Sequence, residues 1–286
     1  MSTDASAPHT VIEPHEGWRG IDWAELWKYR ELLYFFAWRD IKIRYKQTVL
    51  GAAWAIIQPV MTMIVFSIFF GKLGGLDRNV DIPYPIFVYA GILPWTFFAS
   101  GVGQSATSLI GSQNLITKVY FPRAIVPSSA IIAALVDFAV ALGVMFALMA
   151  WYQTTPSWFV LFLPFLVLGL LMAAIGVGTL MAALVVQYRD FRYVVPFMLQ
   201  IWFFASPIAY PLDRVDELAE YLPNVNLRLL YSLNPLAGLI QGFRAALLGE
   251  PVEVGCIAVS LGSSLLLLIV GMIYFARVER QLSDIV

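Results

Sequence analysis

Residues 138–188 form the stretch of sequence that decides the fold. They read FAVALGVMFALMAWYQTTPSWFVLFLPFLVLGLLMAAIGVGTLMAALVVQY, a run of 51 residues without a charged side chain. A helix that crosses a bilayer needs about 20 mostly apolar residues, so this run is long enough for two crossings. The polar, proline-containing segment 151–157 (WYQTTPS) is the natural turn between them. We therefore predict a transmembrane helical hairpin here.

Further uncharged runs lie on both sides of this hairpin. The whole chain is 60% hydrophobic and only 13% charged, whereas a soluble domain carries about a quarter charged residues. Pro196, Pro207 and Pro211 interrupt one of these runs, so we expect that span to be broken. The sequence predicts an all-α integral membrane protein with six transmembrane helices, over residues 50–70, 86–108, 126–150, 158–186, 193–210 and 254–276.

Composition also excludes several classes of function. A net charge of −1 does not suggest a nucleic-acid partner. The chain has one cysteine, Cys256, and its two histidines, His9 and His15, both precede the first apolar segment. A disulfide scaffold, a Cys/His metal site and histidine-based catalysis in the body of the protein are therefore not expected.

The distribution of Lys and Arg predicts the orientation in the membrane. If the N-terminus is cytoplasmic, the inside segments hold thirteen basic residues and the outside segments hold five: Lys72, Arg78, Arg214, Arg228 and Arg244. We therefore expect a multi-pass membrane protein with both termini in the cytoplasm. The first fifty residues contain no apolar core of the kind found in a signal peptide.

The residues before the first span divide into two parts. Residues 1–17 are polar and proline-containing, which predicts a disordered cytoplasmic tail. Residues 18–48 combine aromatic and basic side chains at helical spacing, which predicts an amphipathic helix in the membrane interface ahead of a transmembrane domain over 49–286. A plain basic flank that fixes topology is the alternative. The candidates for contact with lipid headgroups are Trp23, Trp27, Arg39, Lys42, Arg44 and Lys46.

The second inside loop, residues 112–123 (SQNLITKVYFPR), carries more apolar side chains than a simple turn needs. Ile116, Val119, Tyr120 and Phe121 would place apolar groups on the cytoplasmic side. Such a surface suggests a docking element for a soluble partner. The alternative is that these side chains dip back into the headgroup layer.

The last third of the chain contains an apolar segment that is too short to span. Residues 229–243 (LLYSLNPLAGLIQGF) are interrupted by Asn234 and Pro235, and short apolar stretches of this kind are often re-entrant. Irregular backbone at membrane depth is tolerated where it is buried in protein or lines a watery cavity. We therefore predict a re-entrant extracytoplasmic segment before the last helix and, with the broken fifth span, a pathway at that end.

Asp137 is the one carboxylate that falls inside a predicted span. An acid at membrane depth suggests a functional site, although pairing with a neighbouring helix or subunit is an equally open explanation. Aromatic side chains gather toward the outer ends of two spans, where an interfacial belt would also explain them. The candidates for lining a pathway are Trp95, Phe98, Asp137, Trp202, Phe203 and Tyr210.

Several motifs give the chain a resemblance to a known family. The segments are 38–51 (WRDIKIRYKQTVLG), 89–95 (YAGILPW), 114–123 (NLITKVYFPR), 188–190 (YRD), 206–211 (SPIAYP) and 234–236 (NPL). In this order they resemble the membrane subunit of ABC-type polysaccharide exporters. These permeases of the type 2 ABC exporter class serve O-antigen, capsule or teichoic-acid export. The resemblance implies that the chain lies in a bacterial cytoplasmic (inner) membrane.

The resemblance implies a homodimer of this chain that pairs with two copies of a separate P-loop ATPase subunit. ATP and magnesium would bind that subunit, and no cofactor or metal would bind this chain, which carries no P-loop of its own. The cargo would be a polysaccharide on a polyprenyl diphosphate. The loop over 113–123 would be a coupling helix that contacts the ATPase through Asn114, Leu115, Lys118, Tyr120, Phe121 and Arg123.

Three alternatives remain open from the sequence. An exporter of a small lipid or drug would share the same class. An ion-coupled secondary transporter could use Asp137, but no internal repeat supports it. A membrane-embedded glycosyltransferase would need several carboxylates at the membrane face, where the inside loops offer only Asp40 and Asp190.

Overall fold

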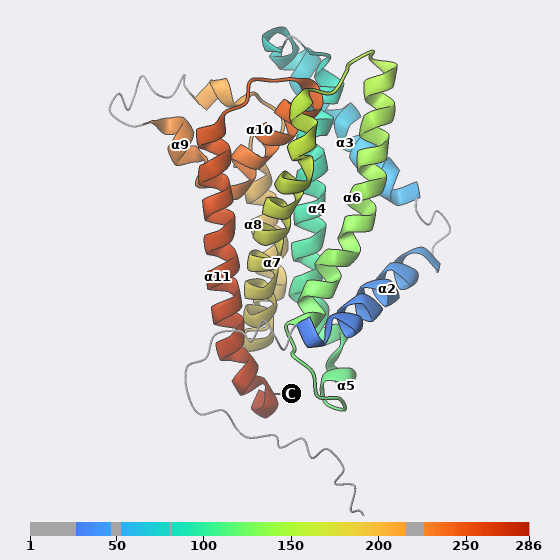
Figure 1. Ribbon diagram of the computed structural model, residues 1–286, viewed down its shortest axis with the longest axis vertical. Coiled ribbons are helices and arrows are strands. Elements are labelled where there is room, and N and C mark those ends of the chain that lie inside the picture. Colours follow the sequence, from blue (N-terminus) through green and yellow to red (C-terminus); the bar gives the residue numbers. More distant parts are fainter. Residues whose placement is uncertain (1–26, 47–52, 81, 216–225, 286) are drawn as a thin grey trace, which may run out of the picture.

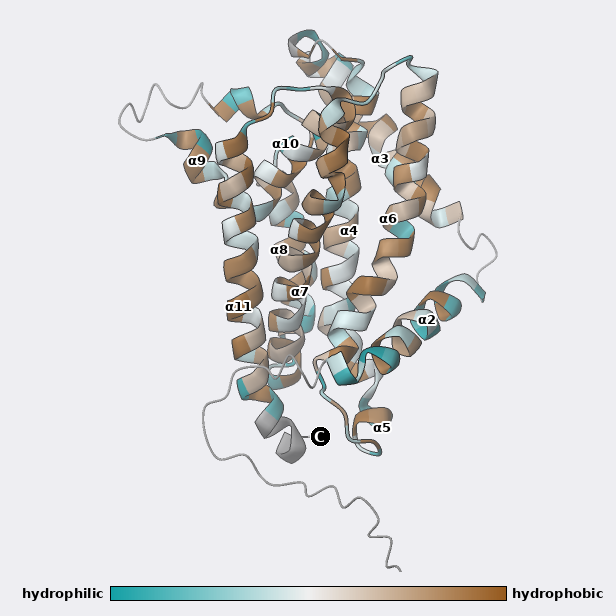
Figure 2. Ribbon diagram, in the orientation of Figure 1, coloured by the Kyte–Doolittle hydropathy of each residue, from teal (hydrophilic) through white to brown (hydrophobic). Residues whose placement is uncertain are grey.

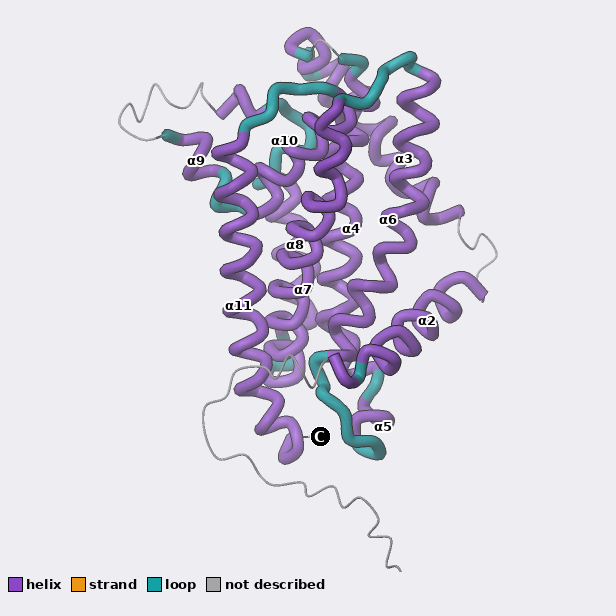
Figure 3. Tube along the Cα trace, in the orientation of Figure 1, coloured by secondary structure: helices purple, strands orange, loops and turns teal. Residues whose placement is uncertain are grey.

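The computed structural model describes residues 27–46, 53–80, 82–215 and 226–285. Within these ranges every regular element is helical (Figure 3). The helices are α2 (Arg30–Lys46), α3 (Ala53–Phe66), α4 (Tyr84–Gly111), α5 (Gln113–Ile116), α6 (Ile125–Trp151), α7 (Leu163–Gln187), α8 (Phe191–Phe204), α9 (Leu227–Tyr231), α10 (Pro235–Leu248) and α11 (Val254–Ile285). A π-helical segment (Ser67–Leu73) and short 3-10 helices, among them Leu76–Asn79 and Trp158–Phe162, are also present. The predicted tail 1–17 and Trp23 lie outside the described residues.

Five of these helical segments are long and apolar enough to cross a membrane. They are Ala53–Leu73, Tyr84–Gly111, Ile125–Trp151, Trp158–Gln187 and Val254–Glu279, and each overlaps a predicted span. The turn of the predicted hairpin is confirmed: α6 ends at Trp151, and the chain continues through a 3-10 helix that begins at Trp158 into α7. At that turn Gln153 adopts a left-handed backbone with φ of 55°.

The fifth predicted span differs from the structure. We predicted a helix over 193–210, but α8 ends at Phe204 after 14 residues. The next residues, including Pro207 and Pro211, continue as irregular backbone, which follows from the missing amide donor of proline. At about 1.5 Å per residue, α8 is roughly 21 Å long and shorter than a bilayer core of about 30 Å.

The bundle is built around α4, whose residues are mostly buried, with α6, α7 and α10 packed against it. Helices α6, α7 and α11 consist largely of hydrophobic residues (Figure 2), and several of their apolar side chains are exposed. Exposed side chains there include Phe165, Leu168, Leu266 and Ile269. A soluble monomer rarely leaves so much apolar surface uncovered, so these faces suit the hydrocarbon of a bilayer.

Helices α7 and α11 approach each other most closely at two glycines. A Cβ atom built on Gly271 would lie 2.0 Å from the carbonyl oxygen of Gly176, and a Cβ atom on Gly176 would lie 2.4 Å from the backbone of Leu267. Small residues of this kind let membrane helices pack backbone against backbone. This contact fixes the position of the long last helix.

The two ends of the bundle carry different elements (Figure 1). Helices α2 and α5 and the C-terminal end of α11 lie together at one end. The α6–α7 turn, α9 and the start of α11 lie at the other end. The candidate residues of the second inside loop and of the interface helix therefore share one end of the molecule.

Candidate functional site

The loop that contains α5 is anchored from behind and exposed in front. Asn114, Lys118 and Tyr120 are exposed, and Tyr120 keeps 70% of its surface accessible. Phe121, in contrast, is buried in a small apolar core beneath the loop. The loop thus presents a mixed polar and aromatic outer surface on a fixed support.

Two contacts hold this loop in place. The ring of Phe121 packs edge to face against Phe36 of α2. The backbone N–H of Arg123 donates to Oε1 of Glu279 on α11 at 2.7 Å, and its guanidinium Nη1 donates to the Glu279 carbonyl oxygen at 3.1 Å. Of the six coupling candidates, Phe121 and Arg123 therefore face inward, Leu115 is half-buried, and the remaining three form the outer surface.

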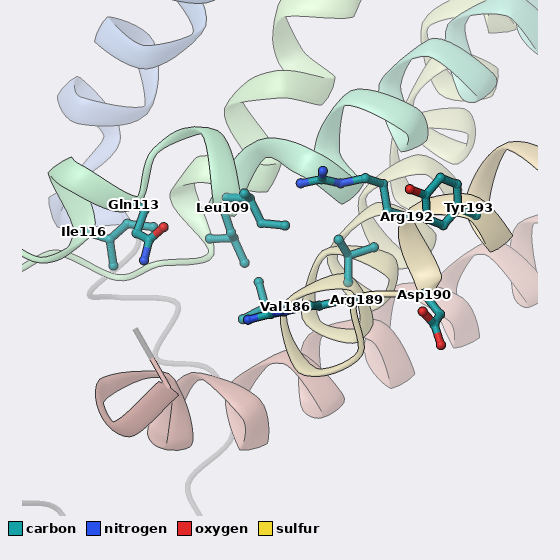
Figure 4. Close-up of a pocket in the computed structure, with 10 residues that line it drawn as sticks. Leu109, Gln113, Ile116, Val186, Arg189, Asp190, Arg192 and Tyr193 are labelled. Atoms are coloured by element: carbon teal, nitrogen blue, oxygen red, sulfur yellow. The ribbon is translucent and has the colours of Figure 1, made fainter.

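A cavity of about 510 Å³ lies beside this loop (Figure 4). Leu109, Gln113 and Ile116 line one side of it, and the α7–α8 turn with Arg189 and Arg192 lines the other. Arg189 and Arg192 are not among the candidate site residues that the sequence indicates. Nothing in their local sequence indicates that they face the α5 loop, since the two segments are more than seventy residues apart.

The predicted interface residues point in two directions, some outward and one into the bundle. Lys42 and Lys46 of α2 are exposed, and so is Trp27, which precedes the helix; this fits the predicted outward stripe. Arg39 stays close to its own helix, where it pairs with Asp40 at 2.9 Å and lies over the ring of Phe36 at 5.0 Å. Arg44 points into the bundle, so it does not extend the outward stripe.

Arg44 and Tyr45 of α2 meet Asp137 of α6. Arg44 forms an ion pair with Oδ2 of Asp137, and the Tyr45 hydroxyl donates to Oδ1. The second Arg44 nitrogen donates to Oε1 of Gln104 on α4. Burial lowers the pKa of the Arg44 guanidinium, while Tyr45 and Asp40 oppose that shift. Of the two roles left open for Asp137, pairing with a neighbouring helix is the one that the structure shows.

These paired groups form part of the wall of a second cavity, of about 530 Å³, between α2, α3, α4 and α6. Its other lining residues include Trp54, Gln58, Trp95, Thr96 and Ser100. The cavity therefore combines two indole rings with hydroxyl and amide groups at the depth of the spanning helices. Two of the six pathway candidates, Trp95 and Asp137, belong to it.

Three of the other aromatic candidates, Phe98, Trp202 and Phe203, cluster with Trp95 between α4 and α8. Phe98 is fully buried and its ring lies 5.0 Å from that of Trp202, while Trp95 lies 5.4 Å from Phe203. Trp202 also donates its indole N–H to Oδ1 of Asn234 at 2.9 Å. The Tyr210 hydroxyl bonds that of Tyr231 at 2.8 Å. Phe98 is thus a packing residue in this chain, and Trp202 lines an apolar groove beside α9 and α11.

The structure gives Arg244 a role that the sequence does not indicate. Arg244, counted above among the outside basic residues, is fully buried in α10. It donates to the carbonyl oxygens of Ile208 at 2.8 Å and Tyr210 at 3.2 Å, and its guanidinium lies 3.6 Å from the centre of the Phe87 ring. Arg244 thereby holds the irregular segment after α8 against α4. Gly91 permits this approach, because a Cβ atom there would lie 2.8 Å from the Ile208 carbonyl oxygen.

The apolar helices and the loop anchored at one end of the bundle define an integral membrane protein. The model of the ABC-2 type transporter family matches residues 31–248, and the chain belongs to that family.

Curated relatives match most of the chain. It is 33% identical over 222 residues to the O-antigen export system permease protein RfbA of Myxococcus xanthus, which covers 77% of this chain and 82% of the relative. It is 26% identical to an O-antigen export system permease protein RfbA of Klebsiella pneumoniae, with 89% and 95% covered. It is also 26% identical to the polysialic acid transport protein KpsM of Escherichia coli, with 86% and 93% covered.

Proposed function

We propose that this chain is the membrane subunit of an ATP-driven exporter that moves a polysaccharide linked to polyprenyl diphosphate across the cytoplasmic membrane. Family membership and the names of three relatives that transport O-antigen or polysialic acid support this proposal. ATP hydrolysis would reside on a separate subunit present in two copies. Two copies of this chain would enclose the channel.

The orientation that we propose places α2, α5 and the end of α11 in the cytoplasm. The revised charge count supports it, because Arg244 lies inside α10 and leaves four basic residues, Lys72, Arg78, Arg214 and Arg228, in the opposite segments against thirteen. In this orientation α8 is a sixth, shortened crossing. The α9–α10 segment, which lies toward the end opposite α2 (Figure 1), is then the re-entrant element.

The ATPase would dock on the exposed side of the α5 loop, through Asn114, Lys118 and Tyr120. Phe121 and Arg123 would support docking indirectly, because they hold the loop against α2 and α11. A docking loop must transmit force, and a loop that is packed on both neighbouring helices can do so. The cavity beside the loop, which Arg189 and Arg192 also line, would adjoin the docked ATPase.

The cavity with Trp54 and Trp95 supports a saccharide as the cargo. Indole faces stack on the apolar faces of sugar rings, while hydroxyl and amide groups such as those of Ser100 and Gln58 pair with sugar hydroxyls. Its volume lies within the ordinary range of ligand pockets, about 300–1,000 Å³. An ion-coupled transporter is less well supported, because both carboxylate oxygens of Asp137 are already engaged by α2.

Purification of the tagged chain from native membranes in mild detergent tests this proposal. We expect a P-loop ATPase to co-purify in equal amount, and Tyr120→Ala to lower its recovery severalfold without loss of the membrane subunit. Tyr152→Ala is the matched control, because Tyr152 is also surface-accessible but lies at the α6–α7 turn. A homo-oligomer without any ATPase, or full recovery with Tyr120→Ala and Lys118→Ala combined, would contradict the docking model.

A further inference from the structure

Helix α2 is fastened to the rest of the protein at two separate points. Near its middle, Phe36 is 3% exposed and packs with Phe121 and Ile116 of the α5 loop. Near its end, Arg44 and Tyr45 bond to Asp137. Eight residues separate the two points, which is about 12 Å along the helix axis.

The second attachment is stronger than a surface ion pair. The side chains of Arg44 and Asp137 are only 26% and 25% exposed. The carboxylate receives donors from both α2 residues, one on each oxygen, and Arg44 also reaches Gln104 of α4. Removing one partner of such a pair leaves a poorly solvated charge behind, which is the costly way to break it. Helix α2 is therefore held to α6 and α4 as well as to the loop.

The second attachment also forms part of the wall of the cavity between α2, α3, α4 and α6. Arg44, Tyr45, Gln104 and Asp137 all line it, and Ser100 lies in the same wall. A displacement of α2 would move these groups together and change the shape of the cavity. A displacement of the α5 loop would act on α2 through Phe121 and Phe36.

We propose that Asp137 is a positioning residue that makes α2 a rigid strut between the α5 loop and the polar cavity. Movement of the loop is carried by α2 to the cavity wall through the Asp137 anchor. The inference rests on the proposed docking of an ATPase at that loop. It assigns Asp137 to the coupling of ATP binding with access to the cavity, and not to ion transport or cargo chemistry.

The test uses a cysteine reporter inside the cavity. Ser100→Cys is introduced into a Cys256→Ser background, and the complete complex with its ATPase is reconstituted into liposomes. The rate of alkylation by a small, membrane-impermeant maleimide is measured with and without ATP under non-hydrolysing conditions. With Asp137 intact we expect ATP to change this rate by at least about fivefold, the lower end of ordinary allosteric coupling.

Asp137→Asn should reduce the ATP-dependent change to less than about twofold while the ATPase remains bound. Asp40→Asn is the matched control, since Asp40 lies on the same helix but pairs within α2, and it should keep the full change. The charge exchange Arg44→Asp with Asp137→Arg should restore the response, which a loss of folding would not allow. A purely structural role would lower the yield of the complex without altering the ratio of the two rates.

The failures are distinguishable. A full ATP response in Asp137→Asn, or no response in the assembled parent complex, overturns the role of Asp137 and leaves ATPase docking intact. Failure of the ATPase to assemble with the parent chain overturns the proposed function and this inference with it.

Discussion

The ring of Phe36 on α2 meets the ring of Phe121 edge to face, with centroids 5.5 Å apart and planes inclined at 71°. The two residues are 85 positions apart in the sequence, and both are nearly fully buried. This contact joins the interface helix to the loop that we propose as the ATPase docking element. Edge-to-face pairs gain about 0.5–1.5 kcal/mol beyond their buried area.

Phe36→Ala and Phe121→Ala should each lower the free energy of unfolding by about 3–5 kcal/mol, the usual cost of removing a buried phenyl ring. The double variant should lose less unfolding free energy than the sum of the two single variants, because the contact between the rings is lost only once. Denaturant titration of the detergent-purified protein measures this. Phe35→Ala is the control, since Phe35 is 62% exposed on the same helix; strict additivity of the two core variants would argue against the contact.

Arg244→Gln should destabilise the protein by about 2–5 kcal/mol, because the carbonyl groups of Ile208 and Tyr210 lose their donors in a buried site. Arg244→Lys should recover only part of this loss, since an ammonium group cannot stack on Phe87 and reach two acceptors in one plane. Thermal unfolding, with limited proteolysis after α8, provides the measurement. Arg78→Gln, at an exposed position, should leave the unfolding temperature and the proteolysis pattern unchanged.

Gly271→Ala should lower stability by roughly 1–3 kcal/mol or more, because its methyl group would overlap the Gly176 carbonyl oxygen and force α7 and α11 apart. Gly262→Ala on the same helix has open space at the Cβ position. It should be neutral or slightly stabilising, since alanine favours helix. Equal unfolding midpoints for the two variants would show that the helices do not touch at Gly271.

Glu250, in the connection between α10 and α11, should make stability depend on pH. Burial raises its pKa above the ordinary 4.5, while the charge of Arg244 and a hydrogen bond from Gln241 oppose that shift. An acid whose pKa is raised on folding contributes stability below its ordinary pKa, and this contribution is lost as pH rises through the folded value.

Glu250→Gln should therefore lose less stability than the parent protein between pH 4.5 and neutrality. Unfolding midpoints at several pH values test this, with Asp77→Asn at an exposed position as the control. A parallel decline in the parent and in Glu250→Gln would contradict the assignment.

The sequence predicted the long helices well because their ends are marked chemically. Charged residues or prolines bound the runs that became α4, α6 and α7. The observed limits of α4 and α6 differ from the predicted ones by one to three residues. Helix α7 ends one residue later than predicted but begins at Leu163, five residues after the predicted start, because Trp158–Phe162 forms a 3-10 helix. The end of α8 was misplaced by six residues because apolarity continues to Leu212 although the helix does not. Only the tertiary partner Arg244 shows how the irregular segment after α8 is stabilised.

The site was predicted only in part, because the sequence indicates which residues need partners but not what those partners are. An acid within an apolar span signals that Asp137 needs a partner, but the sequence does not say which of the many cations supplies it. Arg44 is 93 residues away and stands between the exposed Lys42 and Lys46 on the same helix. Likewise, exposed Tyr120 and buried Phe121 are adjacent, and only the packing against Phe36 separates their roles.

The burial of α10 has a consequence for how the chain is assembled in the membrane. All 14 of its residues are buried, and one of them is an arginine. A segment this short, with a guanidinium at its centre, partitions poorly into lipid as an independent insertion unit. Its stable environment exists only once α4, α7 and α11 surround it. We therefore expect α10 to reach its place only after the final span has been synthesised. Truncation within α11 should then leave a product that membrane quality control degrades.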